Sequence, residues 1–179
     1  MTIVPDAKDW TWVLQRPCPE CGLDTRGLAR EDVAGMLRAN AQEWPAVLAG
    51  PGTGRRPEPA TWSALEYGCH ARDVFRRFDG RLVLMLTRDD PLFPNWDQDA
   101  TAVADRYAEQ DPATVAAELA GAAGVLAGRF EGVSGDQWQR TGRRSDGAAF
   151  TVETFARYFI HDPVHHLYDV TGLRVSANP

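Results

Sequence analysis

The sequence predicts an all-α protein, a four-helix bundle with an irregular N-terminal extension. Four long segments carry apolar side chains at the spacing of an amphipathic helix, and each is bounded by residues that begin or end helices. No segment shows the alternating pattern of a β-strand. Four such helices bury their apolar faces against one another, as in a bundle. Residues 1–27 are expected to form the extension and residues 28–179 the bundle domain.

The first two helices are expected over residues 29–48 and over residues 61–87. The turn Gly50-Pro51-Gly52 ends the first helix. Thr61 is expected to be the N-cap of the second helix, and Asp89-Asp90-Pro91 ends it.

The other two helices follow a long connection, residues 88–110. Because aspartate before proline is a strong helix start signal, Asp111-Pro112 predicts a third helix, over 112–130. A fourth helix is expected over 151–170, where Thr171-Gly172 ends it. The connection is long enough to hide a short helix or to have a functional role.

Charge and hydropathy restrict the possible partners. A nucleic-acid-binding protein needs a stripe of basic residues on its surface. The formal charge of −6 therefore argues against nucleic acid as a partner. The N-terminus has neither the basic nor the apolar region of a secretory signal, and the longest apolar stretch, Leu82–Leu86, is too short to cross a bilayer. We therefore expect a soluble, cytoplasmic protein that binds a small molecule and no membrane, and a homodimer is left open.

The four histidines are the strongest chemical signal in the chain. His161 and His165 are four residues apart on the expected fourth helix, about 40° apart around its axis, so both rings can face one ion. His70 lies among apolar positions of the second helix, where an unpartnered imidazole is costly. A lone buried histidine more often bonds a backbone carbonyl, but the three together predict one divalent metal site. His166 is expected beside that site or at the surface.

A second candidate site is the turn that contains Cys18 and Cys21, which resembles a zinc knuckle. Structural zinc needs four ligands, and because the chain has no second Cys-x-x-Cys, the others would come from Cys69, His166 or a partner chain. A redox pair of thiols and a structural loop with free thiols are the alternatives.

Residues 28–172 resemble the DinB-like (YfiT-like) superfamily. The resemblance implies a four-helix bundle that holds a divalent metal, often zinc or nickel, with a triad matching His70, His161 and His165. The segments that carry it are Glu66–His70, Arg143–Gly147 and Tyr158–His166.

Members of that family include thiol-dependent S-transferases and a mycothiol-dependent maleylpyruvate isomerase. The near-exclusive use of arginine over lysine resembles actinobacterial coding, which would make mycothiol the thiol here. The resemblance therefore implies a metal-dependent S-transferase or isomerase with zinc or nickel and with mycothiol as co-substrate. The alternatives are a metal-dependent hydrolase and a non-catalytic, stress-associated metal-binding protein. An open metal position can bind a thiolate, polarise a carbonyl or activate water.

Five further residues are candidates for substrate binding. Aromatic rings could shape a cleft, and an arginine could receive a carboxylate through two hydrogen bonds. The candidates are Trp62, Trp96, Arg143, Arg144 and Tyr158. Asp97 and Asp99 in the long connection are expected to be solvated.

Overall fold

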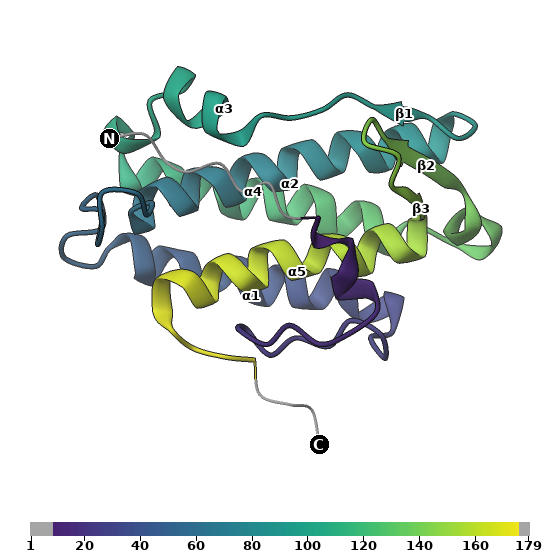
Figure 1. Ribbon diagram of the computed structural model, residues 1–179, viewed down its shortest axis with the longest axis horizontal. Coiled ribbons are helices and arrows are strands. Elements are labelled where there is room, and N and C mark those ends of the chain that lie inside the picture. The colour runs from purple at the N-terminus through teal and green to yellow at the C-terminus, as the bar shows by residue number, and fades with distance from the viewer. Residues whose placement is uncertain (1–8, 176–179) are drawn as a thin grey trace.

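The computed structural model describes residues 9–175, which form the expected bundle. Each of α1 and α2 packs against both α4 and α5, so the consecutive helices α1 and α2 lie across the bundle from each other (Figure 1). The contact between α2 and α5 confirms the expectation that the helices bearing the histidines are neighbours. The four long helices are α1 (Val33–Leu48), α2 (Ala64–Thr87), α4 (Pro112–Glu131) and α5 (Val152–Thr171).

Helix α2 begins later than the sequence suggested. The Ser63 hydroxyl accepts a hydrogen bond from the Glu66 backbone N–H (3.2 Å), and the Glu66 carboxylate accepts one from the Ser63 N–H (2.8 Å). This reciprocal capping box makes Ser63 the N-cap. The prediction of Thr61 was wrong because only Ser63 has a glutamate three residues later. Arg56, in the preceding loop, pairs with the same Glu66 carboxylate.

Aromatic packing fixes α2 against α5. Phe78 of α2 lies with its ring centroid 4.9 Å from those of both Phe155 and Phe159 of α5. Phe75 contacts Phe159 from the next turn of α2. All four rings are buried, so their packing sets the rotation of α5 relative to α2.

A small sheet at one end of the bundle is an addition that the sequence analysis did not predict (Figure 1). Strand β1 (Leu92–Phe93) runs parallel to β2 (Thr141–Arg144), which pairs antiparallel with β3 (Ala149–Thr151). Strands of two to four residues are too short to show alternation. Gly142 is required at the centre, because a Cβ there would lie 2.6 Å from Phe93 Cζ.

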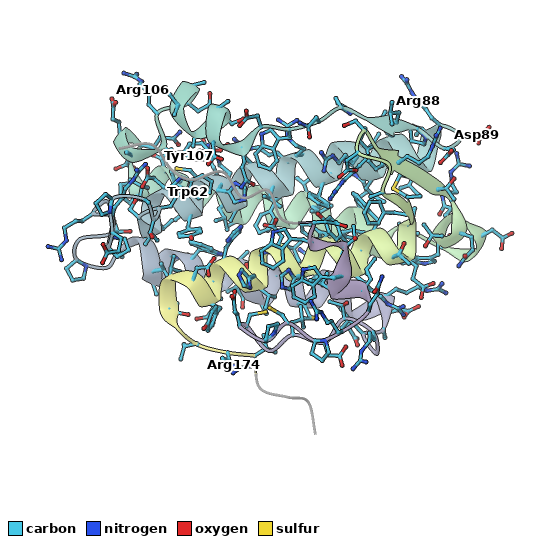
Figure 2. The ribbon with its side chains drawn as sticks, viewed as in Figure 1. Trp62, Arg88, Asp89, Arg106, Tyr107 and Arg174 are labelled. Carbon is cyan, nitrogen blue, oxygen red and sulfur yellow. The ribbon has the colours of Figure 1, made fainter. Side chains whose placement is uncertain are left out.

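The long connection contains short helices as well as β1. They are α3 (Gln98–Ala104) and a 3-10 turn, η3 (Tyr107–Glu109). Asp97 is the N-cap of α3, accepting from the Ala100 N–H at 2.8 Å. Tyr107 is buried beside Trp62, as Figure 2 shows, with ring centroids 6.4 Å apart. The connection is therefore packed onto the bundle.

The N-terminal segment also packs onto the bundle. Its 3-10 helix η1 (Trp10–Leu14) contacts α5, and a further 3-10 turn, η2 (Arg30–Asp32), leads into α1. Cys18 and Cys21 are buried and belong to the same apolar core as the helices. The backbone N–H of Val175 donates to the Cys21 carbonyl (2.9 Å), so the chain after α5 returns to this segment. Across residues 9–175, no helix combines the length and apolarity needed to span a membrane.

Candidate metal centre and adjoining pocket

The donor side chains of α5 face two different neighbours. One residue turns a helix by 100°. The pair His161 and His165 therefore lies on a different face of α5 from the pair Asp162 and His166. The structure collects two clusters whose donor atoms all lie within 4.8 Å of one another. We name them the pocket cluster, which is His70, Asp162 and His166, and the Cys₂His₂ cluster, which is Cys18, Cys21, His161 and His165.

The expected triad is therefore divided between the two clusters. His161 and His165 lie together, with ring centroids 5.0 Å apart. His70 instead lies against His166, at 4.8 Å. Residues 155, 159, 162 and 166 fall on one stripe of α5, and the phenylalanines at the first two positions pack on α2. The same rotation turns His166, rather than His165, toward His70.

The pocket cluster has the donor set of a three-ligand metal site. The Nε2 atom of His166 lies 3.5 Å from Asp162 Oδ1, close to the separation of about 3.4 Å expected for two ligands on one tetrahedral ion. His70 Nε2 lies 4.0 Å from the same oxygen. Asp169 lies 3.0 Å from His166 Nδ1 and accepts its N–H, which leaves Nε2 to act as the ligand atom.

Burial of His70 is the clearest sign that a cation fits this cluster. Both ring nitrogens of His70 and Oδ1 of Asp162 are buried without a hydrogen bond among the described residues. Trp96 stacks on the His70 ring at 5.2 Å, and Trp62 lies 5.0 Å away on another side. Burial lowers the pKa of His70 well below its usual value, so the ring is neutral and can bind a metal.

The Cys₂His₂ cluster lies on the neighbouring face of α5. The Sγ atom of Cys18 is 3.6 Å from His165 Nδ1. Burial raises the pKa of Cys21 to about 12, and burial lowers that of His161 to about 3. Cys69, a ligand considered from the sequence, lies elsewhere and donates to the Tyr107 carbonyl at 3.8 Å.

A pocket of about 300 Å³ adjoins both clusters. Its wall includes Asp162 and His166 of the pocket cluster and His161 and His165 of the Cys₂His₂ cluster. Three candidates from the sequence lie beside them: Trp96, Arg144 and Tyr158. The Arg144 Nη1 donates to the Tyr158 hydroxyl (2.7 Å). The other two candidates lie outside this wall: Trp62 packs on His70, and Arg143 pairs with Asp90 at 2.7 Å.

The structure adds residues to the site that the sequence analysis did not select. Asp162 and His166 repeat the i, i+4 spacing of the neighbouring histidine pair, and that repeat was the available signal. Arg81 and Trp10 also line the pocket. No local pattern marks either of them, because each reaches the pocket through tertiary packing.

Arg81 is an arginine of the pocket wall, and its Nη2 donates to the Pro94 carbonyl (3.4 Å). Among residues 9–175 it forms no ion pair, and its guanidinium lies over the rings of Phe78 and Phe93. Burial, with Arg77 nearby, lowers its pKa to about 10, so it remains charged at neutral pH. Arg144, in contrast, is neutralised by Asp146.

This fold and these clusters define a class of four-helix-bundle proteins with candidate metal ligands on the second and last long helices. The chain belongs to the DinB superfamily, whose family profile matches residues 36–170. A solved structure, YfiT from Bacillus subtilis, is similar with a TM-score of 0.62 and 17% identity, over 96% of this chain and 93% of that one. YfiT is described as a probable metal-dependent hydrolase with an unusual four-helix bundle topology. A comparison with curated proteins gives no match.

Proposed function

We propose that the protein is a metal-dependent enzyme whose reaction takes place in the pocket, with a divalent ion on the pocket cluster. Its substrate is a small molecule with a carboxylate, and its co-substrate is a thiol, mycothiol in an actinobacterial host. The reaction is an S-transfer or a thiol-assisted isomerisation. This ligand set is an alternative to the expected triad of His70, His161 and His165, which stays a prediction.

The observation that carries the proposal is Arg81. A charged guanidinium that lines a pocket without an ion pair is suited to receive an anion, because arginine binds carboxylates through two parallel hydrogen bonds. Asp162 and His166 share that pocket. A substrate held by Arg81 would therefore have its reacting end near the pocket cluster.

The number of protein ligands in the pocket cluster supports a catalytic site rather than a non-catalytic metal-binding site. Three protein ligands leave coordination positions for substrate, whereas a closed structural site has four. A divalent ion bound there would act as a Lewis acid, which lowers the pKa of a thiol or of water. The protein itself holds the His166 ring through Asp169 and covers His70 with Trp96, which keeps bulk water from that side.

The second candidate is metal-dependent hydrolysis without a thiol, and the similarity to YfiT supports it. Zinc-loaded protein should be assayed for consumption of mycothiol with maleylpyruvate and similar carboxylate-bearing electrophiles, and for cleavage of esters and amides without thiol. We expect turnover that requires thiol and metal and falls at least about 100-fold in His70→Ala. Thiol-independent cleavage that is lost in the same variant would overturn the thiol reaction in favour of hydrolysis. Metal binding with no turnover in either assay would overturn catalysis.

A further inference from the structure

The structure points to a second metal site: we propose that the Cys₂His₂ cluster binds a structural zinc ion that fixes the N-terminal segment to α5. This site is separate from the pocket cluster and does not depend on the proposed reaction. All four donor residues are at most 7% exposed. They come from two segments far apart in the chain, the turn at Cys18–Cys21 and the α5 turn at His161–His165.

The distances fit zinc. A tetrahedral ion with bonds of about 2.3 Å to sulfur and about 2.1 Å to nitrogen separates these two donors by about 3.6 Å. The Cys18 Sγ to His165 Nδ1 distance is 3.6 Å. An ion can therefore enter with little movement of this pair.

The histidine rings are oriented as metal ligands. His165 presents Nδ1 to the cysteine, while its Nε2 lies 3.2 Å from Glu20 Oε2. A carboxylate on the far nitrogen fixes the tautomer and ring angle of zinc-binding histidines. The Nε2 atom of His161 is buried with no hydrogen bond in the described range, which is costly unless an ion occupies the cluster.

The cysteine turn is built to hold two sulfurs together. The Gly22 N–H donates to the Cys18 carbonyl (3.0 Å), and the Cys18 N–H donates to the Leu23 carbonyl (2.9 Å). Gly22 has φ +85°, a conformation that favours glycine. The turn thus places both sulfurs beside the α5 histidines.

The chemistry favours a structural role. Two thiolates and two imidazoles complete a tetrahedral zinc shell and leave no position for substrate. Binding replaces the two thiol protons, which pass to solvent. The ion would also fix one side of the pocket, because the ring of Trp10 lies 5.3 Å from His161 and 5.1 Å from His165 and lines that pocket.

The test uses full-length protein carrying His70→Ala, which removes a ligand of the pocket cluster. We expect one zinc ion per chain to remain, with X-ray absorption showing two sulfurs at about 2.3 Å and two nitrogens at about 2.0–2.1 Å. Adding Cys18→Ser should abolish tight binding, whereas the matched buried control Cys69→Ser should retain it. Glu20→Gln should weaken zinc about 10- to 100-fold.

A second readout covers the case in which Cys18→Ser fails to fold. In the protein with intact cysteines, removing zinc with a chelator should speed amide hydrogen exchange in residues 9–25 and leave the exchange of α4 unchanged. A Cys18–Cys21 disulfide in freshly purified protein, a sulfur-free zinc shell, or equal zinc loss in Cys69→Ser would each overturn the proposal.

Discussion

His165 and His166 are adjacent in sequence but belong to different clusters. Their ring centroids are 6.2 Å apart, His165 faces the Cys18 sulfur, and His166 faces His70. A shift of one position along α5 therefore directs a histidine side chain into a different cluster of possible metal ligands. The Cys₂His₂ cluster offers four donors and the pocket cluster three, so the two are expected to differ in metal affinity, exchange and function.

Replacing Arg81 with glutamine should weaken binding of the carboxylate substrate. The loss of a charge-assisted hydrogen bond, about 1.5–3 kcal/mol, raises KM about 10- to 100-fold with a smaller effect on kcat. Arg143→Gln is the matched control, because Arg143 pairs with Asp90 outside the pocket wall. Steady-state kinetics of the two variants in parallel test this role. Equal KM values for Arg81→Gln and Arg143→Gln would contradict it.

Replacing Ser63 with alanine should destabilise the protein by about 1 kcal/mol, the usual contribution of an N-cap. Thr61→Ala should change the free energy of unfolding by less than about 0.5 kcal/mol, because this exposed residue is not the cap. Urea denaturation followed by circular dichroism measures both. Equal losses would mean that the capping box does not determine the start of α2.

Tyr107 should make the fold sensitive to alkaline pH. Burial, and then its hydrogen bond to Asp73 (2.6 Å), raise the pKa of Tyr107 above the value near 10 of an unfolded chain. The folded state keeps its proton, so this stability is fully present below about pH 10 and is lost as pH rises toward the folded pKa, by up to about 1.4 kcal/mol per pH unit.

The variant Tyr107→Phe should lack that alkaline dependence. At neutral pH it should be less stable by about 1–3 kcal/mol, since the Asp73 carboxylate loses a buried partner. Chemical denaturation at pH 8, 9, 10 and 11 gives the slope for both proteins. Parallel curves for wild type and variant would show that Tyr107 ionises at its ordinary pKa in the fold.

The sequence predicts the bundle because its signals are local. Apolar spacing and the start signal Asp111-Pro112 place the helices within a few residues of their observed bounds. The sheet escapes prediction because its pairing of Leu92 with Arg143 joins strands too short to show alternation and distant in the chain. The β-sheet propensity of the individual residues does not show which strands pair.

The candidate site is predicted in part for the same reason. The i, i+4 spacing brings His161 and His165 together without reference to the rest of the fold. The residues that each i, i+4 pair of α5 meets on other segments depend on the rotation of α5 about its axis. Aromatic packing against α2 determines that rotation. The contact of Cys18 with His165 spans 147 positions, and no local pattern reveals it.

The most direct measurement of the two-cluster arrangement is the number of metal ions per chain in matched variants. Native mass spectrometry of zinc-reconstituted protein should show two ions in wild type, one in His70→Ala and one in Cys18→Ser/Cys21→Ser. The combined variant should bind none, and Cys69→Ser should keep both. A single ion in wild type that is lost in His70→Ala and kept in the cysteine variant would contradict the two-cluster account, because no ion would then occupy the Cys₂His₂ cluster.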